Sequence, residues 1–285
     1  MRRQSFILGL GAQKAGSTWL FEYLSTHPQA NMGGWKEFGF WDTLFLEDQT
    51  RRLGYQERLR KLEKSGIRKF EPSNKAMRKN LTTALRLMGT PDEYFPHFAS
   101  LAEQSSGTVL VGDITPSYAR LKASHLQVIK TRVEDAGFDL KPVFIVREPL
   151  SRLRSAYAME LRRTPGFESP MTFEDFAVSE SAAIRTKYED TVTALDSIFA
   201  PGGVYYAAYE SFFTKDKLSE LCSFLKIDYK EPNFEKKINP AMHLFDVNSA
   251  FESTIRKSYE STYEFLYNRF PDWNLRQLWG IEKGP

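Results

Sequence analysis

The sequence of 285 residues has only one cysteine, Cys222, so it cannot form an intramolecular disulfide, and a reducing compartment is favoured. Because Cys222 lies in an apolar helical pattern, we expect it to pack rather than to act as a nucleophile. With four histidines and no Cys/His cluster at zinc-ligand spacing, no metal site is expected. The longest apolar run near the start, 6–10, is far shorter than the roughly 20 residues of a membrane span. We therefore expect a cytoplasmic protein without a transmembrane segment.

Net charge is also small, since 39 Lys and Arg oppose 36 Asp and Glu for a balance of +3. The distribution is nonetheless uneven, because residues 51–80 hold three acids and eleven basic residues, a local balance of +8. The basic ones are Arg51, Arg52, Arg58, Arg60, Lys61, Lys64, Arg68, Lys69, Lys75, Arg78 and Lys79. Such a run is typical of a solvated helix face, and equally of a surface that attracts an anionic partner. Nucleic acid is not expected as that partner, because the pI is moderate and no nucleic-acid-binding module is present.

The apolar and aromatic contents, 41% and 14%, are those of a folded globular protein and exclude a disordered or fibrous chain. Short apolar runs predict strands at 4–11, 108–111, 142–146 and 204–208, the second of them stopped by Gly112 and Asp113. Helical patterns follow at about 19–24, 150–162 and 215–225. This alternation predicts an α/β fold of three layers, in which helices flank a central parallel sheet.

The region from 43 to 100 is predicted to be a mostly helical insertion between the first two strands. No Gly/Ser/Pro-rich linker and no internal repeat divides residues 1–285, so a single domain is expected. In an open parallel sheet, ligands bind beyond the carboxyl ends of the strands. The segments after the first three strands are therefore the first places to search for function.

The segment after the first strand, 11–18, nearly matches a phosphate-binding P-loop. Gly11 and Gly16 have P-loop spacing, but Ser17 stands where the P-loop lysine belongs, and Lys14 lies three residues earlier. Backbone amides and the N-terminus of a helix starting near Ser17 predict an anion site. Without the Lys-Ser/Thr pair that grips phosphates and Mg²⁺, an ATPase is disfavoured.

A second anion site is predicted after the third strand. Arg147 leaves that strand, and Ser155 lies eight residues later, about two turns into the next helix. An arginine fork and a hydroxyl can bind a phosphate together. The alternative is that Arg147 pairs with Glu148 or another carboxylate.

Several motifs taken together resemble the sulfotransferases that use 3′-phosphoadenosine-5′-phosphosulfate (PAPS). Residues 13–20 are similar to the family's 5′-phosphosulfate loop, and 146–157 to its 3′-phosphate pattern (V/I)-R-x-P-x-x-R-x-x-S-x-Y. Residues 36–42 and 112–118 are similar to K-E-P-H-F-F-D and G-E-K-[ST]-P-x-Y of the carbohydrate-sulfating branch, which includes the heparan sulfate enzymes. The resemblance implies the P-loop-like sulfotransferase fold and a soluble enzyme of bacterial type. Gly39 replaces the family's histidine, Phe38 its proline and Ile114 a frequent lysine, so a differently shaped acceptor pocket is expected.

The resemblance also implies roles for particular residues, with PAPS as co-substrate, adenosine 3′,5′-bisphosphate as product and no metal. Lys14 would neutralise the leaving phosphate, Glu37 would be the general base, and Lys36 would contact the sulfuryl group. The alternative for Glu37 is an exposed acid that neutralises Lys36. The nucleotide would be bound by Lys14, Ala15, Gly16, Ser17, Thr18, Trp19, Arg147 and Ser155, with a closing loop containing Lys236 and Lys237. A solvated lysine pair is an equal alternative for the last two.

The acceptor is expected to be a hydroxyl on an anionic glycan, a glycolipid or another small molecule, with the 43–100 insertion forming much of its binding wall. Two other functions stay open. One is a P-loop nucleotide kinase or NTPase, because residues 109–113 superficially resemble a Walker B strand. The other is a nucleotide- or glycan-binding module of the same fold that has lost its chemistry.

Overall fold

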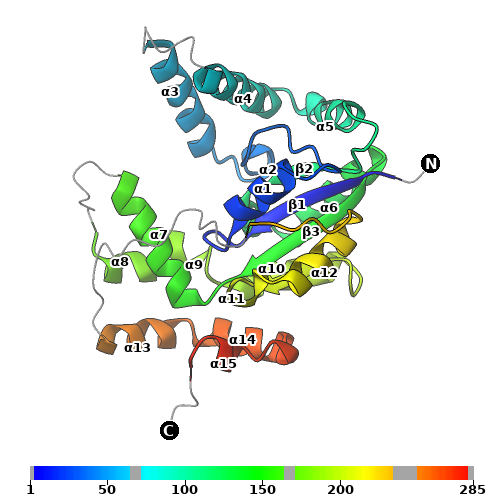
Figure 1. Ribbon diagram of the computed structural model, residues 1–285. Helices are drawn as coiled ribbons and strands as arrows, with labels where there is room; N and C mark the ends of the chain where they lie inside the picture. Colours follow the sequence, from blue (N-terminus) through cyan, green and yellow to red (C-terminus); the bar gives the residue numbers. More distant parts are fainter. Residues whose placement is uncertain (1–2, 65–71, 164–170, 234–248, 282–285) are drawn as a thin grey trace.

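A four-stranded, all-parallel sheet forms the centre of the computed structural model, which describes residues 3–64, 72–163, 171–233 and 249–281 (Figure 1). The strand order is β2-β1-β3-β4. The strands are β1 (Ser5–Gly11), β2 (Leu110–Ile114), β3 (Asp139–Val146) and β4 (Tyr205–Ala208). All four predicted apolar runs are therefore strands, and the predicted parallel sheet is confirmed.

The predicted end of the second strand is wrong, because β2 continues through Gly112 and Asp113 to Ile114. Gly112 has φ +149°, and a Cβ built there would lie 2.1 Å from the carbonyl oxygen of Ile7 on β1. Glycine is needed here because the neighbouring strand passes too close for a side chain. The residue that reads as a turn signal is thus a packing requirement inside the sheet.

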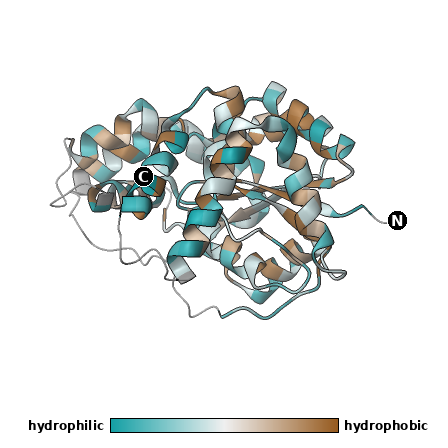
Figure 2. Ribbon diagram, turned by 90° about the horizontal axis from the view of Figure 1, so that it is seen from above, coloured by the Kyte–Doolittle hydropathy of each residue, from teal (hydrophilic) through white to brown (hydrophobic). Residues whose placement is uncertain are grey.

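Two pairs of helices cover the sheet. α1 (Ser17–Ser25) lies beside α12 (Lys215–Leu225), where the Tyr23 hydroxyl is 3.3 Å from Sγ of Cys222, which is buried as expected. α6 (Ala123–Asp135) packs on α10 (Tyr188–Ile198). Because crossovers between parallel strands are right-handed, the pairs lie on opposite faces, and Figure 2 shows helices on both sides of the strands.

The region between β1 and β2 is mostly helical, as predicted. Its helices are α2 (Phe40–Phe45), α3 (Thr50–Lys64), α4 (Pro72–Gly89) and α5 (Tyr94–Glu103), with a 3₁₀ turn at Pro91–Glu93. α5 is tied to the sheet through Phe98, whose ring lies edge-on to Phe6 of β1 at 5.0 Å. α3 has no buried residue and lies against α4, so these two helices stand at the margin of the molecule (Figure 1).

The remaining helices gather near the carboxyl ends of β3 and β4 (Figure 1). They are α7 (Pro149–Arg163), α8 (Phe173–Val178), α9 (Glu180–Ala183), α11 (Tyr209–Phe212), α13 (Ser249–Ser258), α14 (Glu260–Arg269) and α15 (Leu275–Leu278). α13 packs on α7 and α8, and α14 packs on α10. Among the residues that the structure describes, no helix combines the length and apolar character needed to cross a membrane.

Candidate active site

The turn from β1 to α1 has the backbone of an anion site. Lys14 and Gly16 both have left-handed backbones, with φ of 71° and 82°, and Ala15 between them is buried. A Cβ on Gly16 would lie 3.1 Å from the ring of Phe213, so the turn closes tightly over α11. The first amides of a helix have no intrahelical acceptor and carry its positive dipole end. The amides of Ser17, Thr18 and Trp19 at the start of α1 therefore suit a phosphate or sulfate.

The indole of Trp19 is packed among aromatic side chains. It is 8% exposed and stacked on Tyr23, with ring centroids 5.6 Å apart. Its ring also meets Phe212 edge-on. The contribution of Trp19 to an anion site is therefore its backbone amide, while its side chain joins α1 to the core.

Arg147, directly after β3, contacts the same turn. Its Nη1 donates a hydrogen bond of 2.9 Å to the carbonyl oxygen of Lys14, and its guanidinium lies 4.6 Å above the ring of Tyr209. Within the described residues it forms no ion pair with Glu148, the alternative considered from the sequence; that carboxylate pairs with Arg256. Nε of Arg147 is buried without a partner in the described part of the chain. The arginine thus keeps donors that an anion can use.

Ser155 lies half-buried on α7, the helix that begins two residues after Arg147. The carboxyl end of β3 carries Arg147, and the middle of α7 carries Ser155, the other residue of the predicted 3′-phosphate pair. Lys236 and Lys237 belong to residues 234–248, outside the described part of the chain.

Arg152 is a member of the site that the sequence reading did not single out, although it is the second arginine of the R-x-P-x-x-R pattern. It is 1% exposed, and its Nη2 donates to Oε1 of Gln13 in the β1–α1 turn at 2.8 Å. Nη1 donates to Oγ1 of Thr186, also at 2.8 Å. None of the ion pairs among the described residues includes Arg152, and burial lowers its pKa to about 10. A buried cation without a carboxylate beneath this turn favours an anionic ligand above it.

Lys36 and Glu37 lie beyond the end of β2, where the amide of Glu37 donates to the carbonyl oxygen of Ile114. The carboxylate of Glu37 is held by two cations: Nζ of Lys36 is 2.6 Å from Oε1, and Nη1 of Arg51 is 2.5 Å from Oε2. Burial alone would raise the pKa of Glu37, but these two charges outweigh it and lower the pKa to about 2. The ion pair with Lys36 is the one named in the alternative interpretation of Glu37, and Glu37 is fully ionised at neutral pH.

Arg51 reaches Glu37 from α3 because position 39 is glycine. Gly39 has φ +67°, and a Cβ there would lie 2.2 Å from Cδ of Arg51 and 2.7 Å from its Nε. Any side chain at position 39 would displace the arginine. Arg51 therefore occupies the space beside position 39 that a side chain there would take. The basic stretch at 51–79 contributes its first residue directly to the site.

A chain of polar contacts anchors Arg51 on its other side. Its Nη2 donates to Oγ of Ser117 at 3.0 Å, and Ser117 Oγ donates to Oδ2 of the buried Asp42. Oδ1 of Asp42 is 3.3 Å from Nη2 of Arg120. The network joins α2, α3 and the turn after β2, which positions Glu37 by long-range contacts that no local motif reveals.

Asp113, a carboxylate at the end of β2, is unsuited to accept a proton from a substrate. It is 1% exposed and accepts hydrogen bonds from Oγ1 of Thr115 at 2.7 Å and from the hydroxyls of Tyr118 and Tyr94 at 2.5 and 3.1 Å. Burial raises its pKa to about 6 against these hydrogen bonds. Asp113 therefore supports the turn after β2 from within the core.

Glu210 and His27 are also engaged by other groups. Oε1 of Glu210 accepts from the amide of Glu148 and Oε2 accepts from Nε1 of Trp279, each at 3.0 Å. Both ring nitrogens of His27 have backbone partners, the carbonyl oxygen of Asp228 and the amide of Gln29. Of the carboxylates considered as the base, only Glu37 combines partial exposure, 31% of its side chain, with a place beside predicted substrate contacts.

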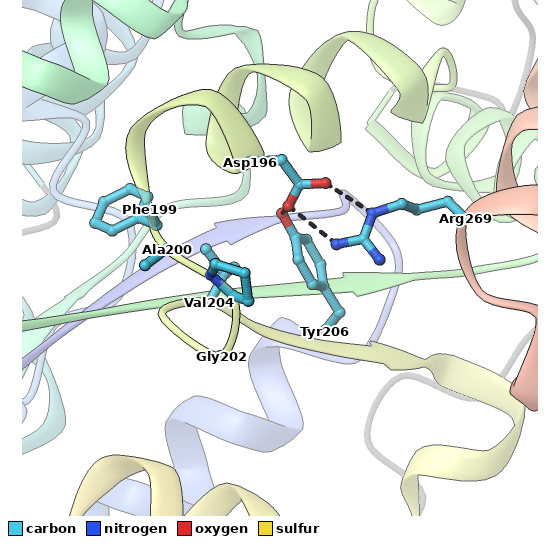
Figure 3. A pocket seen from close by; sticks show the side chains of 8 residues that line it. Asp196, Phe199, Ala200, Gly202, Val204, Tyr206 and Arg269 are labelled. Atoms are coloured by element: carbon cyan, nitrogen blue, oxygen red, sulfur yellow. Dashed lines mark hydrogen bonds and ion pairs between the residues drawn. The ribbon is translucent and has the colours of Figure 1, made fainter.

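A pocket of about 280 Å³ lies elsewhere, at the segment that precedes β4 (Figure 3). Its polar groups satisfy one another: Arg269 pairs with Asp196 at 2.7 Å, and the hydroxyl of Tyr206 donates to Asp196 at 2.9 Å. It is also near the amino end of its strand, whereas ligands of parallel sheets bind at the carboxyl ends. We therefore place the candidate site at the turns after β1, β2 and β3.

Comparisons with known proteins bear on the family and the fold of the chain. A model of the Sulfotransferase family matches residues 6–231, and no curated protein matches the chain. The crystal structure of a sulfotransferase from Alicyclobacillus acidocaldarius aligns with a TM-score of 0.57 and 18% identity, over 94% of this chain and 96% of that one. This likeness supports the fold.

Two further structures are less similar. The sulfotransferase domain of the Synechococcus PCC 7002 olefin synthase has a TM-score of 0.45 and 18% identity, over 91% of this chain and 94% of that one. The sulfotransferase domain of the curacin biosynthetic pathway also has a TM-score of 0.45, with 17% identity, over 81% and 76%. No group of Cys, His, Asp and Glu side chains able to hold a metal is found in the described residues.

Proposed function

Since the chain belongs to the Sulfotransferase family, we propose that it transfers the sulfuryl group of PAPS to a hydroxyl of a carbohydrate or glycolipid acceptor. As a member of this family it is an enzyme of the EC 2.8.2 type, and the family implies PAPS as donor. The observation that carries the proposal is the meeting of two anion-binding segments, since Arg147 after β3 donates to the backbone of Lys14 after β1. A nucleotide with phosphates at both its 3′ and 5′ positions suits two such adjoining segments.

The residues of the β1–α1 turn would bind the 5′ end of the donor. The amides and hydroxyls of Ser17 and Thr18 would hold its oxygens, and Lys14 would neutralise the charge that grows on the leaving phosphate. In the transfer, the acceptor oxygen bonds to sulfur as the bond from sulfur to the phosphate oxygen breaks, and the electron pair leaves with adenosine 3′,5′-bisphosphate. Arg147 and Ser155 would bind the 3′-phosphate.

Glu37 would take the proton of the acceptor hydroxyl. A carboxylate with a pKa of about 2 is a weak base, so its basicity must rise during the reaction. Lys36 supplies a way: when its ammonium turns to the sulfuryl group, one of the two charges that lower the pKa of Glu37 is withdrawn. Arg51 stays behind and keeps the carboxylate in place. In this proposal Lys36 couples donor binding to activation of the base.

The acceptor would approach along α3 and α4. Seven of the eleven basic residues of the 51–79 stretch are exposed on these helices: Arg58, Arg60, Lys61, Lys64, Lys75, Arg78 and Lys79. Arg68 and Lys69 lie outside the described residues. Because α3 also carries Arg51 into the site, an anionic acceptor drawn to this surface is delivered to Glu37. This favours an anionic glycan or glycolipid.

The test is transfer of ³⁵S-labelled sulfate from PAPS to a panel of polysaccharides, glycolipids, peptides and small alcohols. We expect labelled product with an anionic glycan or glycolipid, and none with Lys14→Ala. Binding of adenosine 3′,5′-bisphosphate without transfer to any acceptor would indicate the inactive module instead. Turnover of ATP with Mg²⁺ and no use of PAPS would contradict the proposal in favour of a nucleotide kinase or NTPase.

A further inference from the structure

Two carboxylates flank Arg147, the residue proposed to bind the 3′-phosphate. Glu148 is next in the chain and 4% exposed, and Glu210 accepts a hydrogen bond of 3.0 Å from the amide of Glu148. Negative groups so close to a phosphate-binding arginine are a problem, because each competes with the phosphate for the guanidinium. Other groups must therefore bind these two carboxylates.

The side chains that bind the carboxylates of Glu148 and Glu210 come from the C-terminal helices. Nη1 of Arg256 on α13 lies 2.8 Å from Oε1 of Glu148, and the hydroxyl of Tyr263 on α14 donates to the same oxygen. Nε1 of Trp279, just after α15, donates to Oε2 of Glu210 at 3.0 Å. We call Arg256, Tyr263 and Trp279 the C-terminal brace. All three lie beyond residue 231, where the match to the family model ends.

Glu148 also fixes the helix that carries Ser155. Its carboxylate accepts from the amides of Leu150 at 3.2 Å and Ser151 at 2.6 Å, so it caps the first turn of α7. A second contact, between Arg154 and Glu252, ties α7 to α13, and Figure 1 shows α13 beneath α7 and α8. Arg256 and Tyr263 thus act through Glu148 on the helix that carries Ser155, and Trp279 acts on the second carboxylate, Glu210.

We propose that the C-terminal brace positions Arg147 and Ser155 for the 3′-phosphate by holding Glu148 and Glu210 away from the arginine. Without Arg256, Glu148 becomes a buried carboxylate that has lost its cation, and in this proposal it turns to the guanidinium of Arg147, the residue before it. The arginine would then be taken from the phosphate. This inference rests on the proposed function, because it presumes a nucleotide that carries a 3′-phosphate.

The test is calorimetric binding of adenosine 3′,5′-bisphosphate and of AMP to the full chain. Arg256→Met should lower the preference for the bisphosphate by about tenfold, since a charge-assisted hydrogen bond is lost at the 3′-phosphate. Affinity for AMP should stay within about twofold of wild type. Arg276→Met is the matched control, because Arg276 lies in the same C-terminal segment but pairs with the exposed Glu264 at 2.7 Å. It should leave both affinities unchanged.

A second variant separates competition by Glu148 from simple loosening of the fold. Adding Glu148→Gln to Arg256→Met removes the competing charge, and the preference for the bisphosphate should return to within about twofold of wild type. If Arg256→Met does not fold, Tyr263→Phe is measured in the same way, because it removes only the hydroxyl on Glu148.

The possible results are distinct. An unchanged preference in Arg256→Met or Tyr263→Phe would overturn the inference, and so would equal weakening of both nucleotides, which indicates a structural role only. If the double variant did not regain the preference for the bisphosphate, the proposed competition by Glu148 would be wrong. A wild-type protein that does not prefer the bisphosphate would instead contradict the proposed function, and the inference with it.

Discussion

The two halves of the candidate site are built in different ways. The donor half, at the ends of β1 and β3, consists of a tight turn, the first amides of α1 and an arginine that donates to the turn's own backbone. The acceptor half consists of side-chain ion pairs, in which Glu37 is held by Lys36 beside it and by Arg51 from α3. Backbone on strand ends gives a rigid cradle, whereas ion pairs between side chains can exchange partners during a reaction.

This contrast matches the demands of the proposed chemistry. The donor keeps the same phosphates in every cycle, so its cradle can be fixed in advance. The base must accept a proton and later release it. Its pKa must therefore change during the reaction, which requires that neighbouring charges move. In the acceptor half, the side chain of Arg51 lies where a Cβ at position 39 would clash with it, so this arrangement requires glycine there. Substitutions in the two halves should therefore have different signatures.

The largest effect is expected for Glu37→Gln. The amide keeps the shape of the side chain but cannot take a proton, so kcat should fall by about 10²–10⁴-fold. Affinity for adenosine 3′,5′-bisphosphate should stay near wild type, because Glu37 belongs to the acceptor half. Glu57→Gln is the control, since Glu57 is also ion-paired but lies on the exposed part of α3. Near-normal turnover with a confirmed acceptor would make Glu37 structural.

Lys14→Ala should affect turnover by about 10²–10³-fold, the usual loss when one donor to a developing charge is removed. In contrast to Glu37→Gln, it should also weaken donor binding. Steady-state kinetics with PAPS and calorimetry with the bisphosphate measure the two effects separately. Lys217→Ala, which removes an exposed lysine paired with Glu220 on α12, should change neither. Loss of turnover with unchanged donor affinity would move Lys14 out of the donor half.

Arg51→Ala tests the charges around the base through the pH dependence of kcat. In the wild type, the pKa of about 2 keeps Glu37 ionised down to strongly acidic pH, so Glu37 imposes no acid limb near neutrality. Removing Arg51 should raise the pKa of Glu37 and move the acid limb upward by about one pH unit or more. Arg52→Ala, at the next position of α3, is the control. An acid limb that stays in place would show that Arg51 does not act on Glu37.

The ion pair between Glu37 and Arg51 also affects the stability of the fold. Because the folded-state pKa of Glu37 is lowered from 4.5 to about 2, its contribution is present above about pH 4.5 and is lost as the pH falls toward 2. Arg51→Ala should therefore lose some stability at neutral pH and differ less from wild type in acid. Thermal unfolding at both pH values measures the difference, and an equal loss at both would contradict it.

The smallest effect is expected from the exposed face of α3 and α4. Reversing Lys64 and Lys79 to glutamate should raise the acceptor KM by about two- to tenfold, because exposed charge interactions are each worth about 0.2–1 kcal/mol. The effect should shrink as salt rises through the physiological range, while bisphosphate affinity stays constant. The same reversal at Arg132 on α6 and Lys215 on α12 is the control. If the acceptor KM changed neither with salt nor with the charge reversal, the basic face of α3 and α4 would be a solvated surface that does not bind the acceptor.

The two halves also differ in how far they could be predicted from the sequence. In the donor half, the β1–α1 turn follows a local pattern, because an apolar strand, a glycine turn and a helix start adjoin in the sequence, whereas Arg152 beneath the turn does not. Arg51 and Arg152 were not assigned because their partners, Glu37 and Gln13, are 14 and 139 positions away. From the sequence alone, Gly39 is only a departure from the family pattern. Its physical reason requires the position of α3, which no local pattern supplies.

Gly112 shows the same limit within the fold. Glycine followed by aspartate is a common stop signal for a strand, and it predicts the wrong end for β2 because the deciding contact is with Ile7 on the neighbouring strand. Apolar runs such as those of β3 and β4 were predicted well because burial on both faces of a parallel sheet leaves a continuous signature.

The central claim is that the strand ends bind a nucleotide through both its 5′ and its 3′ phosphates. The most direct measurement is the calorimetric affinity of the wild-type protein for adenosine 3′,5′-bisphosphate compared with AMP. A charge-assisted hydrogen bond to the 3′-phosphate is worth about 1.5–3 kcal/mol, so the bisphosphate should bind at least about tenfold more tightly. Equal affinities for the two nucleotides would contradict the assignment of Arg147 and Ser155 and, with it, the proposed function.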